Sequence, residues 1–339
     1  MTAPAFLLKW GSHGHTDGLF NHPYGVAVDT SGNIYVVDYS NYRVQKFSSN
    51  GTYITQWGSG GSGDGQFNQP YDIAIDSSNN VYVTDAGNDR VQKFTSAGVY
   101  VSQWGWYAYQ HGIAVDPSGN VYVTDTFNDN IQKFTSGGVY ITDWGSYGDT
   151  DGLFHDPRGI AIDSSGNVYV ADTYNDRIQK FTSAGAFITK WGTTGSGNGK
   201  FMLPQAVDVD SSGNVYVADT DNNRIQKFTS TGVYITQWGS FGTGDGQFKS
   251  PSGIVVDSSG NVYVADLYNE RVQKFGVYVP PIPIPPTPVV PPIGRLSNPA
   301  DGAITYQLNS MTADEDVGSQ YDHLMALREI TNYDLRTRP

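Results

Sequence analysis

The chain has 339 residues, a formal net charge of −13 at pH 7, 40 glycines, 23 tyrosines and no cysteine. The lack of cysteine excludes disulfides, thiolate-bound zinc and cysteine nucleophiles. The acidic balance repels phosphate backbones, and the sequence contains no basic patch to offset it, so we expect no nucleic-acid partner. No run approaches the roughly 18 apolar residues of a transmembrane helix, so we expect no membrane span.

The N-terminal segment does not resemble a signal peptide, because residues 1–11 lack a basic region and a sustained apolar run. Residues 6–11 read FLLKWG instead, and they match the last β-type run of the repeats that follow, such as YITQWG at residues 53–58. The first three runs of a repeat are missing in front of this segment. We therefore expect it to be a strand that pairs with the far end of the chain.

Six near-copies of one unit follow. Each contains the tripeptide QKF, at steps of 47 residues except for one step of 40, with the phenylalanines Phe47, Phe94, Phe134, Phe181, Phe228 and Phe275. Each unit has four short runs rich in β-branched and aromatic residues, as at 159–163, 167–172, 177–181 and 186–191, separated by turn residues. This pattern predicts an all-β fold over residues 1–279: a closed six-bladed β-propeller of four-stranded blades, with the N-terminal strand completing the last blade.

The repeat pattern PxGIAVDxSGNVYVADxxNxRIQKF resembles the NHL repeat, from residue 6 to about residue 279. The resemblance implies a six-bladed propeller that binds, because NHL proteins are mostly sensor ectodomains, protein-interaction platforms or RNA-binding domains with basic faces. A minority are enzymes, notably the peptidyl-hydroxyglycine amidating lyase, which holds a metal through several histidines at the start of inner strands. Only His111 has that position here.

Positions shared by the six repeats are best explained by the blade itself. The second run of every repeat ends in an aspartate: Asp38, Asp85, Asp125, Asp172, Asp219 and Asp266. Five residues later, five repeats have an arginine and the third has Asn130; the arginines are Arg43, Arg90, Arg177, Arg224 and Arg271. We interpret these carboxylates as structural groups that bond turn amides and pair with the arginine of the same or a neighbouring blade. A ring of metal ligands is the alternative.

One position varies while its neighbours stay nearly fixed. It is the second residue of the innermost strand, near the mouth of the channel, and the six residues, called the mouth ring below, are Tyr24, Tyr71, His111, Arg158, Gln205 and Ser252. Variation on a rigid scaffold is typical of a recognition surface. Free drift of water-facing side chains is the alternative.

The third repeat is also shorter, since its crossover from the preceding repeat has lost seven residues and carries Trp106, Tyr107 and Tyr109 beside His111. Aromatic faces with a few polar groups suit sugars or peptide side chains. We therefore expect these residues to join the mouth ring in binding a protein or glycan ligand. Packing of the aromatic rings into the vacated volume is the alternative.

Two carboxylates depart from the repeat, Asp72 at a Gly or Ala position and Asp208 at an Ala or Val position. An unpaired carboxylate on an inner strand is costly, so we expect both to be paired or hydrated. The alternative is a metal-dependent enzyme of the lactonase or amidating-lyase type, with Ca²⁺ held in the central channel by Asp72, Asp208 and Gln205. Apart from this alternative, we expect no cofactor.

The end of the chain has a different composition. Residues 280–294 are rich in proline and predict an extended linker. Residues 295–339 are too few to build a core, so we expect a docking segment with a short amphipathic helix that carries Tyr321, Leu324 and Ile330.

These features favour a non-catalytic binding or scaffold protein, located at the cell surface or outside the cell. The evidence for that location is the acidic, lysine-poor composition, the turns rich in Gly, Ser, Thr and Asn, and the proline-rich linker. The linker separates two adhesive parts, the propeller and the tail. A tail that binds the propeller of the next copy would build a ring or a filament.

We predict that deleting residues 280–339 converts an oligomer into a monomer, because the deletion removes the docking segment. Light scattering on the full chain and on a variant that ends at Val279 measures this directly. Equal assembly of the two proteins would contradict the prediction.

Overall fold

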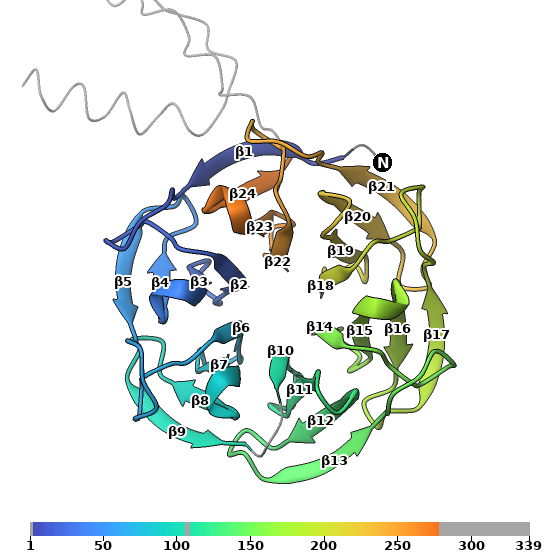
Figure 1. The fold of residues 1–339 in the computed structure, drawn as a ribbon, viewed down its shortest axis with the longest axis horizontal. Coiled ribbons are helices and arrows are strands. Elements are labelled where there is room, and N and C mark those ends of the chain that lie inside the picture. The colour runs from blue at the N-terminus through green and yellow to red at the C-terminus, as the bar shows by residue number, and fades with distance from the viewer. Residues whose placement is uncertain (1–2, 106–108, 278–339) are drawn as a thin grey trace, which may run out of the picture. The chain divides into compact units, whose positions relative to one another are not determined.

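The computed structural model describes residues 3–105 and 109–277. These residues form six four-stranded antiparallel sheets, arranged as blades around a central channel (Figure 1). The all-β, six-bladed architecture predicted from the repeats is therefore confirmed.

The first three blades are as follows. Blade 1 consists of β2 (Pro23–Val28), β3 (Ile34–Asp38), β4 (Arg43–Phe47) and β5 (Tyr53–Trp57). Blade 2 consists of β6 (Pro70–Ile75), β7 (Val81–Asp85), β8 (Arg90–Phe94) and β9 (Tyr100–Trp104). Blade 3 consists of β10 (Gln110–Val115), β11 (Val121–Asp125), β12 (Asn130–Phe134) and β13 (Tyr140–Trp144).

The other three blades repeat this arrangement. Blade 4 consists of β14 (Pro157–Ile162), β15 (Val168–Asp172), β16 (Arg177–Phe181) and β17 (Phe187–Trp191). Blade 5 consists of β18 (Pro204–Val209), β19 (Val215–Asp219), β20 (Arg224–Phe228) and β21 (Tyr234–Trp238). Blade 6 consists of β22 (Pro251–Val256), β23 (Val262–Asp266), β24 (Arg271–Gly276) and β1 (Ala5–Trp10). Short 3-10 turns follow the second strand in four blades: η1 (Tyr39–Asn41), η2 (Ala86–Asn88), η3 (Thr173–Asn175) and η4 (Leu267–Asn269).

The N-terminal strand closes the ring. Strand β1 pairs antiparallel with β24, with Phe6 opposite Phe275 and Trp10 opposite Val272. Blade 6 is thus built from both ends of the repeat region, as predicted. Closure leaves neither the first nor the last repeat with an incomplete sheet, so the barrier to opening the ring includes the whole β1–β24 ladder.

The core lies between blades rather than within one sheet. All five residues of β3 are buried, because a second strand is covered on both faces by adjacent blades. Tyr35 and Val37 of blade 1 pack in one cluster with Ile73 and Val83 of blade 2. The outermost strands, such as β5, alternate between half-buried and exposed residues because only one of their faces is covered.

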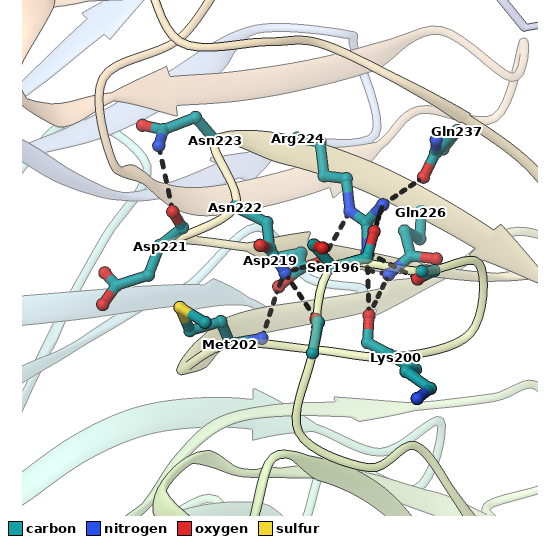
Figure 2. Close-up of polar contacts among 12 residues, drawn as sticks. Ser196, Lys200, Met202, Asp219, Asp221, Asn222, Asn223, Arg224, Gln226 and Gln237 are labelled. Carbon is teal, nitrogen blue, oxygen red and sulfur yellow. Dashed lines mark hydrogen bonds and ion pairs between the residues drawn. The ribbon is translucent and has the colours of Figure 1, made fainter.

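The shared aspartate and arginine hold down the crossover arm, which is the segment that links the fourth strand of one blade to the first strand of the next. In blade 5, Arg224 Nε donates to Asp219 Oδ2 at 2.7 Å, and Arg224 Nη2 donates to the Lys200 carbonyl of the arm at 2.9 Å (Figure 2). Gln226 Nε2 donates to the same carbonyl at 2.7 Å, and the Met202 amide donates to Asp219 Oδ1 at 2.8 Å. The turn, the third strand and the arm are therefore tied together by buried polar groups.

Four other blades make the same ion pair within one blade, with the arginine Nε 2.6–2.7 Å from the carboxylate: Asp38–Arg43, Asp85–Arg90, Asp172–Arg177 and Asp266–Arg271. These aspartates are thus saturated by protein donors, as the structural interpretation predicted, and each arginine pairs with its own blade's aspartate rather than a neighbour's.

Blade 3 lacks both the long arm and the arginine. Asn130 takes the arginine position, and its buried Oδ1 has no hydrogen-bond partner among the residues that the structure describes. In the other blades the arginine donates to carbonyls of the long arm, as Arg224 does in blade 5. An arginine at position 130 would lack these acceptors. The deletion and the Arg-to-Asn exchange are therefore two parts of one local change.

Within residues 3–105 and 109–277, no helix has the length and apolar character needed to cross a membrane.

We predict that Arg224→Ala lowers the free energy of unfolding by about 3 kcal/mol, because it removes a donor from the buried carboxylate of Asp219 and from three arm carbonyls. Urea denaturation measures the difference. Asn130→Ala is the matched control, with an expected loss below about 1 kcal/mol, since Asn130 holds no arm. Equal losses in the two variants would show that the network does not stabilise the blade.

Candidate functional site

The mouth ring lies where the six innermost strands begin, on the face that also carries the crossover arms. Five of its members line a hollow of about 630 Å³, called the top-face hollow below: Tyr24, Tyr71, His111, Arg158 and Gln205. Ser252 does not join them. Its buried hydroxyl donates to the Pro23 carbonyl at 3.1 Å and so links blade 6 to blade 1. Ser252 lines the channel instead of the hollow, and its part in the predicted recognition surface stays a prediction.

Aromatic rings from blades 1 to 3 form one contiguous cluster in the hollow. Tyr71 and His111 are stacked, with ring centroids 4.3 Å apart and planes at 24°. Tyr24 is edge-on to both, at 5.0 Å from Tyr71 and 5.2 Å from His111. Tyr39 lies 5.0 Å from Tyr71 and 6.2 Å from Tyr24. Such edge-on and offset contacts fix the orientation of the rings.

The hydroxyl groups of this cluster are used to position it. Tyr24 donates its hydroxyl hydrogen to Gln205 Oε1, a contact that joins blade 1 to blade 5 across the mouth. The hydroxyls of Tyr71 and Tyr109 lie 2.6 Å apart, and Tyr109 also donates to Gln69 Oε1 at 3.2 Å. Tyr24, His111 and Gln205 also line the channel below, so they form the floor of the hollow and the ceiling of the channel.

Electrostatics keep this floor uncharged. Burial, together with the Arg158 charge, holds the pKa of His111 well below its usual value of 6.5. Burial raises the pKa of Tyr24 and outweighs the lowering effect of Arg158, and burial also raises the pKa of Tyr71. At neutral pH the imidazole and both phenols are therefore neutral.

Arg158 is the cation of the hollow. Its Nε and Nη2 donate to the two oxygens of Asp156, each at 3.1 Å. The guanidinium also lies over the Tyr174 ring, 5.8 Å from the centroid. A fork-to-carboxylate pair of this kind fixes the orientation of Arg158 and balances its charge.

Several residues of the hollow were missed by the sequence analysis. Phe127 and Tyr268 stand on its rim with 78% and 58% of their surfaces exposed, and Tyr39, His22 and Asp156 also line it. Phe127 and Tyr268 occupy the second position of the turn between the second and third strands. Comparing that turn position across the six repeats, as was done for the mouth ring, would have identified both.

Some of the predicted residues cannot be placed. Trp106 and Tyr107 lie outside the described residues, as do Tyr321, Leu324 and Ile330 of the tail. Tyr109 is described and reaches the hollow, as expected.

A narrower cavity of about 180 Å³ continues into the channel and is lined mainly by Val, Ile and Ala. Asp72 and Asp208 line it as well, and each accepts a hydrogen bond from the next blade: Asp72 Oδ2 from the Ile113 amide at 3.2 Å, and Asp208 Oδ2 from the Val256 amide at 2.7 Å. Both side chains are thus paired with backbone donors, as the preferred interpretation held. The partners are amides rather than an arginine.

Burial raises the pKa of Asp72 to about 7 and outweighs the lowering by the amides of Ile73 and Ile113. Burial also raises the pKa of Asp208 to about 7, the amides of Val256 and Val209 oppose it, and the charges of Asp210 and Asp72 add to it. The two carboxyls therefore titrate near neutral pH.

Sequence comparison identifies the fold family. The model of the NHL repeat matches residues 20–47, 67–94, 111–134, 154–181, 201–228 and 248–275, once in each blade. The chain is an NHL-repeat six-bladed β-propeller. A search of curated protein sequences gives no match to it.

The NHL propeller is similar in fold to solved structures of several functions. A streptogramin B lyase is 18% identical at a TM-score of 0.55, over 75% of this chain and 78% of that one. A gluconolactonase from Xanthomonas campestris is 15% identical at a TM-score of 0.58, over 76% of this chain and 86% of that one. An auxiliary nutrient binding protein from Bacteroides thetaiotaomicron is 16% identical at a TM-score of 0.60, over 76% of this chain and 69% of that one. At these identities the likeness concerns the fold alone, and it includes enzymes as well as a binding protein.

Histidines on the arms of the NHL propeller contribute to closure. His13 Nδ1 and His22 Nε2 lie 3.6 and 3.9 Å from Glu270 Oε1 at the seam between blades 6 and 1, and the His22 amide donates to Glu270 Oε2. Across the described ranges, no three His, Asp or Glu side chains are close enough together to hold a metal ion. Asp72, Asp208 and Gln205, the calcium ligands of the alternative, all line the channel cavity.

We predict that Asp72→Asn stabilises the NHL propeller at alkaline pH and not at acidic pH. The folded carboxyl has a pKa of about 7 against 3.8 for the unfolded chain. The folded state therefore binds an extra proton between these values, and wild-type stability falls as the pH rises through that window. The advantage of the variant should be absent near pH 4 and reach on the order of 2–4 kcal/mol near pH 8, measured by urea denaturation.

Asp163→Asn is the control with the opposite sign. Burial opposes ionisation of Asp163, but hydrogen bonds from Asn167 and Tyr169 outweigh it and lower the pKa. This variant should be less stable than wild type at pH 8, with a deficit that shrinks in acid. Parallel pH profiles for Asp72→Asn and wild type would contradict the assignment of a raised pKa.

Proposed function

We propose that this NHL propeller is a non-catalytic binding protein that recognises its ligand in the top-face hollow. One observation carries the proposal: every blade contributes side chains to the hollow, and they come from positions that differ between blades whose surroundings are nearly identical. A rigid frame with variable residues at one mouth is the arrangement expected of a recognition site.

The chemistry of the hollow supports binding. Its polar groups are oriented by contacts with one another: Tyr24 with Gln205, Tyr71 with Tyr109, and Arg158 with Asp156. His111 is stacked on Tyr71 and neutral, which suits a hydrogen-bonding role. Pre-ordered side chains lose little conformational entropy when a ligand arrives.

The alternative function is a metal-dependent propeller enzyme that works in the channel. The observation in its favour is the pair Asp72 and Asp208 in the channel. Burial raises the pKa of each to about 7, and a bound cation would stabilise their charged forms. The lyase and lactonase among the similar structures raise the same possibility.

We also propose that the protein acts at the cell surface or outside the cell and assembles through its C-terminal segment. The acidic composition and the proline-rich linker of residues 280–294 support both points.

A ligand screen tests the proposal. Differential scanning fluorimetry with peptides, oligosaccharides and lactones should give compounds that raise the melting temperature of the native protein. Arg158→Gln should reduce that increase by more than half, because it removes the only guanidinium among the described residues that line the hollow. Gln205 at the same repeat position shows that glutamine is tolerated there. A bound compound should be recovered chemically unchanged after incubation.

Lys190→Gln is the matched control, because it removes one positive charge from an exposed pair with Asp151 far along the outer strand, where Gln56 and Gln237 stand in other blades. It should not alter the response. Conversion of a lactone that stops when EDTA is added would replace the proposal by the enzyme alternative.

A further inference from the structure

We infer that the ligand of the top-face hollow is a neutral oligosaccharide. This inference rests on the proposed binding function and adds the chemical class of the ligand. Three independent features of the hollow support it: exposed aromatic rings on the rim, charges that cancel inside, and several hydrogen-bonding side chains in its lining.

The rim presents aromatic faces that the blade does not need. Phe127 and Tyr268 are 78% and 58% exposed, yet the same turn position holds Ser40, Gly87 and Asp221 in other blades. Exposed rings on a rigid turn keep apolar surface in water until a partner covers it. The C–H faces of a sugar ring are flat and weakly apolar, so they match such a surface.

Charges in the hollow are balanced before any ligand binds. Arg158 faces Asp156 with two hydrogen bonds, and His22 Nε2 lies 3.9 Å from Glu270 Oε1. Tyr24, Tyr71 and His111 are neutral at physiological pH. A charged ligand would therefore lose its hydration without gaining a free counter-charge, and an anionic one would also be repelled by the net charge of −13.

The remaining polar atoms match hydroxyl groups better than a peptide backbone. The hollow offers the guanidinium of Arg158, the carboxylate of Asp156, the amide of Gln205 and the hydroxyl of Tyr109. A peptide in extended form is recognised mainly through backbone pairing with a free strand edge. The inner strands are edge strands of their sheets, but their residues line the narrow channel of about 180 Å³ below the floor, and the hollow above it is lined mainly by side chains from strand starts and turns. The volume of about 630 Å³ exceeds a single sugar ring and lies in the usual range of ligand sites.

A glycan array followed by calorimetry on the full chain tests the inference. The array carries neutral glucan, mannan, xylan and galactan oligosaccharides together with sulfated and uronic-acid oligosaccharides. We expect binding to neutral members only, with an affinity that changes less than about twofold between roughly 0.05 and 0.5 M salt. Phe127→Ser and Tyr268→Ser should each weaken binding about tenfold.

Two further variants make the result specific. Phe241→Thr removes a ring that is equally exposed, at 69%, but stands on a crossover arm outside the hollow, where Thr194 occupies the same place in another arm. It should bind like wild type. Ser40 at the position of Phe127 and Tyr268 shows that the serine variants suit the blade, and circular dichroism confirms that they fold.

The outcomes separate the two proposals. Tighter binding of acidic than of neutral oligosaccharides, or no glycan binding while a peptide library binds and Phe127→Ser blocks it, overturns the sugar inference and leaves the binding function standing. Neutral glycans that bind equally well to Phe127→Ser, Tyr268→Ser and Arg158→Gln would place the sugar elsewhere and overturn both. Binding confined to neutral glycans and lost in the rim variants supports both.

Discussion

The buried pair of aspartate and arginine that fastens each crossover arm is the interaction on which the top face depends. In blade 5, Asp219 orients Arg224, and Arg224 then donates to arm carbonyls such as that of Lys200. The arms are rich in glycine, and each long arm also buries one phenylalanine in the core, as Phe201 does beside Phe228. The arginine holds the polar part of the arm that this ring leaves exposed to bending. Because the arginine head is buried with its acceptors in place, removing either side leaves polar groups unsatisfied inside the protein. Five fastened arms give the hollow rigid walls.

Blade 3 lacks this pair of aspartate and arginine. Its arm is shortened, its arginine is replaced by Asn130, and the aromatic residues Tyr109 and His111 reach the mouth at that point. The propeller keeps its other five blades in register through β1 and β24 and through the cores between blades. A repeat protein can therefore change one blade locally while its neighbours preserve the frame, and the hollow is asymmetric as a result.

The hollow and the channel below it are chemically different sites separated by one layer of side chains. Tyr24, His111 and Gln205 form that layer, and the contact of Tyr24 with Gln205 crosses the mouth from blade 1 to blade 5. Above it the charges cancel and aromatic rings dominate. Below it Asp72 and Asp208 titrate near pH 7 within an apolar wall. Protonation of these carboxyls changes the stability of the frame, because their charged forms are costly in the channel.

The sequence by itself determined the architecture and the positions of the mouth ring, because six copies in one chain reveal the strand pattern, the closure by residues 6–11 and the places where one blade departs from the others. It also placed Asp72 and Asp208 on the inner strands. Only the tertiary structure decided which side chains meet, since contacts such as Tyr71 on His111 or Arg158 beside Asp156 depend on rotamers and on the tilt of separate blades. For the same reason Ser252, which shares the repeat position of Tyr24, bonds the Pro23 carbonyl at the seam. Phe127 and Tyr268 differ from their counterparts in other repeats, but only the structure shows that they reach the rim of the hollow.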